Sequence, residues 1–332
     1  MNRRTFISRS LSAAAGLSLA GWPRPAAASG ETVVFFALNT QDFAYPEYTA
    51  VLLDRALTLH ESLGVPLDIY LTTWMVDLLQ GAGDLARRLV TSPVVSLAYH
   101  TRAPLPYRVN YDWYGLSGMT TAEQYAVVMA YETHGLDMVT GMPLERPGGY
   151  QHYANLIGRP PRAVGIASEA SIQGAVDTVF RDLGARITVA NDRLANLGSM
   201  RNGLYERPEH VDLKLFERVG ESPAAILDQA LAEAPATAGA VAPYFVGVKM
   251  HDNDFFASQS AWTAVYLAPG ARRGPPWDTS LRATLLTEAE MAARWSLWEG
   301  MVREVAARGI PVVNSEGLLQ QLADPLRSLR TR

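Results

Sequence analysis

TVVFFALNTQD, residues 32–42, decides the fold class, because an unbroken run of β-forming residues ends abruptly in polar ones. Residues 33–38 are apolar at successive positions rather than at alternate ones, which is typical of a strand buried on both faces of a parallel sheet. Most of six further short runs share this character: residues 66–71, 93–99, 162–167, 186–190, 244–250 and 311–313. We therefore predict seven strands.

The segments between these strands carry helical spacing. Residues 50–63 place Leu52, Leu53, Ala56, Leu57 and Leu63 on one stripe, and residues 121–136, 172–183 and 288–307 also read as helices. Strands that alternate with helices predict a parallel α/β architecture. Seven strands favour a barrel, with an open doubly wound sheet as the alternative. No G-x-G-x-x-G follows the first strand, which removes the main reason to prefer a dinucleotide-binding fold.

The N-terminus reads as an export signal. Arg3 and Arg4 are followed, after one residue, by Phe6. An apolar stretch follows at residues 11–20, and alanines occupy residues 26–28. This order predicts a twin-arginine signal peptide over residues 1–28 and one domain over residues 29–332. The protein would pass through the twin-arginine translocase to the periplasm or beyond. The apolar stretch is about half the ~20 residues that span a bilayer, so we expect no stable membrane anchor.

Composition excludes several function classes. The chain has no cysteine, so disulfides, thiolate metal sites and cysteine nucleophiles are impossible. It carries 29 basic and 33 acidic residues, and removal of the four arginines in residues 1–28 changes the net charge from −4 to −8. Such a protein repels the phosphates of nucleic acid. We therefore expect no nucleic-acid partner. The negative charge does not exclude neutral substrates such as sugars.

Polar side chains follow the predicted strands, and in parallel barrels these ends meet at one mouth where chemistry is done. His100 and His251 each come directly after a buried strand, although histidine is not a preferred turn residue. Asp42 and Glu169 follow two other strands. Aspartate with neutral histidines can hold a divalent metal, most often zinc, which activates a water molecule. Alternatively, Asp42, Glu169 and Asp252 could supply a carboxylate pair for glycoside hydrolysis.

Aromatic residues crowd the long segments beside these strand ends and favour a carbohydrate ligand, because sugar rings stack on aromatic faces. The predicted substrate contacts are Tyr107, Trp113 and Tyr150, together with Arg102. The same aromatic residues could instead pack the loops onto the barrel.

The pattern resembles the polysaccharide deacetylase superfamily of carbohydrate esterases, which are distorted (β/α)7 barrels with a metal held by one aspartate and two histidines. Asn39-Thr40-Gln41-Asp42 corresponds to the family's Thr-Phe-Asp-Asp-like motif, and His100-Thr101 to the start of its His-Ser/Thr-x-x-His motif. Residues 246–251, VGVKMH, resemble the late strand that ends in the catalytic histidine. The resemblance implies that Asp42 and His100 bind the metal and that His251 is a general acid.

Two positions depart from the family pattern. Gln41 stands where the family has its base aspartate, and Pro104 stands where it has its second metal histidine. We predict that His152, Asp112 or Asp252 completes the metal site, with His152 preferred, and that Asp42 and His251 act in catalysis. The leading hypothesis is an exported deacetylase-like hydrolase acting on carbohydrate. The alternatives are a glycosidase-like hydrolase that uses Asp42 and Glu169, and a catalytically silent carbohydrate-binding barrel.

Overall fold

The computed structural model describes residues 32–81, 83–101, 103–108, 111–189, 194–267 and 274–330, with side chains up to residue 323. The predicted leader, residues 1–28, lies outside this part of the chain, as does Arg102. The helices are α2 (Pro46–Leu63), α3 (Thr73–Gly81), α4 (Asp84–Thr91), α5 (Thr121–Thr133), α6 (Gly149–Ile157), α7 (Gln173–Leu183), α8 (Pro223–Ala236), α9 (Glu288–Ala307) and α10 (Ser315–Arg330). No helix among these residues is long and apolar enough to cross a membrane.

A curled, mostly parallel sheet of nine strands organises the molecule. Its order is β10 (Val211–Lys214), β11 (Tyr244–His251), β1 (Thr32–Thr40), β2 (Leu67–Leu71), β3 (Val95–His100), β6 (Ala163–Gly165), β7 (Ile187–Thr188), β9 (Leu204–Glu206) and β8 (Met200–Arg201). All neighbours are parallel except β8 and β9. The predicted α/β class is confirmed.

The predicted elements are found with two local differences. Residues 311–313 do not form a full strand, since Val312 makes only an isolated parallel bridge with Val34 of β1. The helix predicted over residues 121–136 ends at Thr133, and its last residues form β4 (His134–Leu136), which pairs with β5 (Pro143–Pro147). Gly148 lets the chain after β5 pass close to β4, because a Cβ there would lie 2.1 Å from the carbonyl oxygen of His134.

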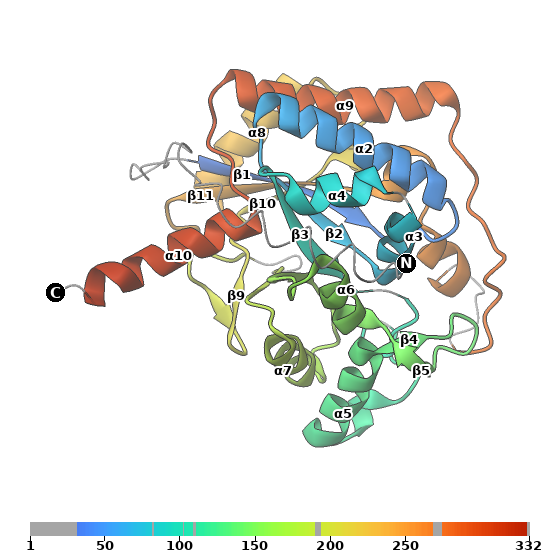
Figure 1. Cartoon of the computed structure of the whole chain (residues 1–332). Coiled ribbons are helices and arrows are strands. Elements are labelled where there is room, and N and C mark those ends of the chain that lie inside the picture. The colour runs from blue at the N-terminus through green and yellow to red at the C-terminus, as the bar shows by residue number, and fades with distance from the viewer. Residues whose placement is uncertain are drawn as a thin grey trace, which may run out of the picture.

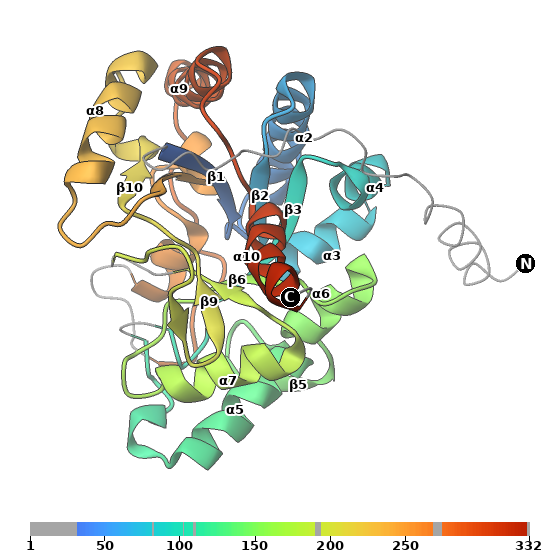
Figure 2. The ribbon, with the colours of Figure 1, turned by 90° about the vertical axis from the view of Figure 1, so that its left-hand side faces the viewer.

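The sheet has two faces because successive side chains of a strand point in opposite directions. On β1, Val34, Phe36 and Leu38 join the large core between the sheet and its covering helices. Figures 1 and 2 show α2, α8 and α9 above the curled sheet and α5 and α7 below it, and residues of all five helices join this same core. Phe36 lies against Trp298 of α9, with ring centroids 5.6 Å apart.

The inner, concave face is packed at one end and open at the other. Phe35 of β1 and Phe245 of β11 pack there with Leu318 and Leu319 of α10, the helix that faces the viewer in Figure 2. Asp68 of β2 accepts hydrogen bonds from the backbone N–H and the hydroxyl of Ser315, which holds the start of α10 in place. The amino ends of the strands are therefore filled, and the carboxyl ends are left for a site.

Candidate functional site

A cavity of about 120 Å³ lies at the carboxyl ends of the strands. Ala37, Gly165, Ile166, Ala167 and Val189 form its apolar part. Eight polar or charged residues line the rest: Asn39, Tyr70, His100, Arg108, Arg207, Glu209, Lys249 and His251. The sheet thus brings together His100 and His251, as the sequence predicts, and surrounds them with basic side chains.

Strand register explains how these residues meet. Asn39 of β1 pairs with His251 of β11 and with Tyr70 of β2, so their side chains stand at one level of the inner face. Lys249 lies two residues before His251 and points to the same side. His100 ends β3, where it pairs with Gly165.

His251 is held by Asp254, three residues further along the chain. Its Nδ1 lies 3.0 Å from Oδ2 of Asp254, and its backbone N–H donates to the same oxygen over 2.8 Å. A carboxylate at Nδ1 favours the tautomer that leaves Nε2 unprotonated. The ring is therefore oriented for proton transfer at Nε2, and its side chain is 23% exposed. This pair has the composition of a general base with its orienting carboxylate.

His100 is a neutral imidazole. Its Nδ1 lies 2.7 Å from the carbonyl oxygen of Thr101, which can only accept, so Nδ1 carries the proton. The pKa of His100 is lowered to about 3, chiefly by burial and also by the nearby Arg108 and His251, while the Thr101 hydrogen bond opposes the shift. Nε2 of His100 is consequently an acceptor at neutral pH.

Two of the three basic residues in the cavity have carboxylate partners. Arg207 binds Glu209 over 2.7 Å, and Lys249 binds Asp212 over 2.8 Å. Glu209 fits because it packs over Gly247 of β11, where a Cβ would lie 2.3 Å from its Oε2. Arg108 differs: Nη1 donates to the hydroxyl of Thr101 over 2.7 Å, and the guanidinium carbon lies 4.4 Å from the ring centre of Trp262.

Asp42 and Asp252 form a separate structure, here called the carboxylate clasp. Asp42 accepts three backbone N–H groups, from Ala44, Tyr45 and Ala261. Asp252 accepts the backbone N–H groups of Gln41 and Asp42 and the hydroxyl of Thr49. Burial raises the pKa of both carboxyls, and the charge of Asp42 helps to bring the pKa of Asp252 to about 6. The clasp ties the segment after β1 to the segments after β11.

The residues predicted as metal ligands do not converge. His100 lines the cavity, Asp42 is 3% exposed and holds backbone N–H groups, and His152 on α6 bonds to Asp77 on α3 over 2.6 Å. Over the described ranges, no group of three or more histidine, aspartate or glutamate residues is arranged to hold a metal. Asp42, His100 and His152 thus make separate contacts within the fold, and a metal site formed by them stays a prediction.

The predicted substrate contacts are placed mainly in packed regions. Tyr107 and Tyr150 are fully buried, and their hydroxyls donate to Glu132 and to the carbonyl of Pro161. Trp113 packs edge-on against Trp277. Glu169, the carboxylate of the glycosidase hypothesis, is partly buried, and its N–H donates to the carbonyl oxygen of Tyr107. The alternative for these aromatic residues is that they pack the loops onto the barrel. The burial of Tyr107 and Tyr150 agrees with this alternative.

Sequence reasoning did not single out Arg108, Arg207, Glu209 or Lys249. Lys249 carried a usable signal, since it precedes His251 by two positions on one strand and must share its face. Arg207 and Glu209 lie in a segment without an apolar run, so nothing marked it as part of the sheet. Arg108 lies in a loop, and its position depends on tertiary contacts.

Comparison with known proteins supports the fold. The chain matches no model of a known family and no curated protein. Among solved structures it is similar to the crystal structure of a "putative polysaccharide deacetylase" from Mycobacterium smegmatis, with a TM-score of 0.51, 12% sequence identity and 93% of each chain covered. At this identity the similarity concerns the fold, which is an α/β fold of the deacetylase-like kind.

Proposed function

We propose that this protein is an exported hydrolase of the deacetylase-like esterase kind that acts on carbohydrate. The observation that carries the proposal is the pair His251–Asp254 at a cavity on the carboxyl ends of the strands. The similarity to the deacetylase-like fold over 93% of the chain is consistent with it. The leader sequence is the basis for export to the periplasm or beyond.

The proposed fold in finer detail is a distorted seven-stranded barrel. Its support is the extended segment 204–214, which contacts both edges of the curled sheet. The N–H of Arg207 donates to the carbonyl of Thr188 in β7, and the N–H of His210 donates to the carbonyl of Phe245 in β11. Counted as one strand, this segment joins β11, β1, β2, β3, β6 and β7 in a ring of seven.

The cavity residues can perform ester hydrolysis by proton transfer. Nε2 of His251 accepts a proton as a water molecule attacks the acetyl carbonyl carbon, while Asp254 stabilises the imidazolium that forms. Lys249 and the hydroxyl of Tyr70 line the same cavity and suit the developing oxyanion. When the tetrahedral intermediate collapses, His251 returns the proton to the leaving sugar oxygen, and acetate is released.

Other readings of the sequence receive less support from this geometry. The glycosidase hypothesis needs Asp42 to face a substrate, yet Asp42 is occupied by backbone N–H groups. The zinc site stays a prediction, and the reaction described above uses only side chains of this protein. A silent carbohydrate-binding barrel stays as an alternative that only activity can separate.

Acetate release tests the proposal. The protein without residues 1–28 is incubated with acetylated oligosaccharides, and free acetate and reducing ends are measured. We expect acetate without new reducing ends, and its loss in His251→Asn. Reducing sugar without acetate would establish the glycosidase instead, and carbohydrate binding with neither product would establish the silent barrel.

A further inference from the structure

Arg108 is the cavity residue that neither the fold nor the proposed chemistry accounts for. Among the described residues, its side chain forms one hydrogen bond, to the neutral hydroxyl of Thr101, and no carboxylate lies at ion-pair distance from it. A guanidinium carries five N–H donors in one plane. Most of these donors therefore lack an acceptor in the described part of the protein.

The surroundings of Arg108 hold the guanidinium in place without neutralising it. Trp262 contacts it at 4.4 Å from the ring centre, a cation–π arrangement. The hydroxyl of Thr101, the residue that follows β3, accepts a hydrogen bond from Nη1 of Arg108. Burial lowers the pKa of Arg108 to about 10, which still leaves it charged at neutral pH. Arg108 is only partly buried and lines the cavity, so an anion that enters can bind the donors that the protein leaves unused.

The other charges of the cavity do not compete for that anion. Arg207 is paired with Glu209 and Lys249 with Asp212, and His100 is neutral. Arg108 is therefore the cavity cation without a carboxylate partner among the described residues, and its single charge matches a monoanion better than a dianion. A planar carboxylate also matches the two parallel donors of a guanidinium.

The size of the cavity limits what carries the carboxylate. Its volume is about 120 Å³. For comparison, an engineered protein cavity of about 150 Å³ holds one benzene molecule. The space therefore takes the carboxylate-bearing part of one sugar unit rather than a longer chain.

We propose that the cavity recognises an acidic sugar unit, with Arg108 binding its carboxylate beside the His251–Asp254 pair. This inference rests on the proposed action on carbohydrate and names its substrate class as uronic-acid-containing saccharides. Arg108 is then a residue that sets specificity, whereas His251 moves protons.

Binding of single sugars tests this without an activity assay. Titration calorimetry compares galacturonate and glucuronate with galactose and glucose, using the protein without residues 1–28. We expect each uronate to bind at least about 10-fold more tightly than its neutral counterpart, which corresponds to about 1.4 kcal/mol. Inorganic phosphate and acetate are titrated alongside, and both should bind more weakly than the uronates.

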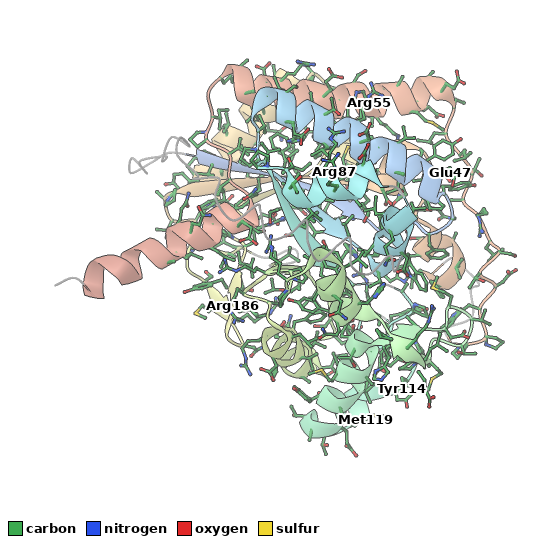
Figure 3. All side chains as sticks on the ribbon, viewed as in Figure 1. Glu47, Arg55, Arg87, Tyr114, Met119 and Arg186 are labelled. Carbon is green, nitrogen blue, oxygen red and sulfur yellow. The ribbon has the colours of Figure 1, made fainter. Side chains whose placement is uncertain are left out.

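Variants separate specificity from folding and from catalysis. Arg108→Gln should reduce the preference for uronates to near unity, and Arg108→Lys should keep part of it. Arg87→Gln is the matched control, because Arg87 lies on α4 with a side chain 67% exposed (Figure 3). His251→Asn should keep the preference while acetate release is lost.

Three results would overturn the inference: equal binding of uronates and neutral sugars, an unchanged preference in Arg108→Gln, or phosphate or acetate binding as tightly as the uronates. Failure of the proposed function is distinguishable, because it appears as absent acetate release with the uronate preference intact.

Discussion

The carboxylate clasp and the cavity are built from neighbouring residues at the ends of the same two strands. The clasp holds segments of the fold together, whereas the cavity is available to a ligand. His251 and Asp252 are adjacent in sequence, but His251 lines the cavity while Asp252 is fully buried in the clasp. The alternation of side chains along the chain sends them to different sides. A polar residue at the end of a strand is therefore not, for that reason alone, a residue of the functional site.

What separates the two regions is the supply of hydrogen-bond partners. The oxygens of Asp42 are used by backbone N–H groups and those of Asp252 by backbone groups and Thr49, so the clasp is satisfied within the fold. In the cavity, Arg108 keeps donors in excess and His251 keeps Nε2 available. A satisfied polar group stabilises a structure, whereas an unsatisfied one in a cavity is available to a ligand.

The largest effect is expected at His251. Replacement by Asn removes the proton-transfer group while keeping a polar side chain, and we expect kcat for acetate release to fall by roughly 10²–10⁴-fold. The melting temperature should change little, because the side chain is partly exposed in the cavity. Steady-state kinetics with thermal melting measures both. A fall of less than about threefold would remove His251 from the reaction.

Asp42 provides the opposite pattern. Asp42→Ala leaves three backbone N–H groups without their acceptor, and each such loss costs about 1–3 kcal/mol when the group is buried. We expect the free energy of unfolding to fall by about 3 kcal/mol, as urea denaturation would measure. Acetate release by the remaining folded protein at low temperature should persist. Lost activity with unchanged stability would instead return Asp42 to the catalytic role predicted from the sequence.

The sequence was most informative where local patterns act alone. The continuous apolar runs predicted β1, β2, β3 and β11 within two residues at each end, because burial on both faces leaves a clear signature. The helix predicted over residues 288–307 matches α9, and a capping box of Thr287 and Glu290 forms at its start. The pairing of His100 and His251 at one cavity also followed from strand ends alone.

The remaining features depend on contacts that no local pattern records. β9 and β10 are short and polar, so no apolar run marks the segment that reaches both β7 and β11. The resemblance implies that Asp42 binds a metal, and no local pattern indicates that its carboxylate also accepts N–H groups of Ala44, Tyr45 and Ala261. Burial of Tyr107 and Tyr150 likewise depends on packing rather than on their place in a long loop.

A smaller, pH-dependent effect is expected at Thr49. The pKa of Asp252 in the folded protein, about 6, exceeds its ordinary value of 3.8. A raised carboxyl pKa contributes stability that is complete below about pH 4 and is lost as pH rises through about 6. The Thr49 hydroxyl favours the ionised form, so Thr49→Val should raise this pKa further.

The cost of Thr49→Val should therefore grow with pH. We expect about 2 kcal/mol at pH 8, where the hydrogen bond is to a charged group, and about 1 kcal/mol at pH 4, where it is to a neutral one. Urea denaturation at the two pH values measures this, with Thr58→Val on the exposed side of α2 as the control. A cost that is equal at both values would contradict an ionised Asp252 in the clasp.

The smallest effect is expected at His100. The informative result there is that the ring does not titrate between pH 8 and pH 5. With a pKa of about 3, only about 1% of the ring is protonated at pH 5, so its NMR signals should stay fixed between pH 8 and pH 5. Its lowered pKa contributes stability above pH 6.5 that is lost as pH falls toward 3. Titration of the ring near pH 6 would contradict the buried, neutral state bonded to Thr101.

Adding zinc to the same sample tests the metal prediction, because ligation at Nε2 of His100 would shift these NMR signals at constant pH. His134, which is exposed on β4, is the control that reports non-specific binding.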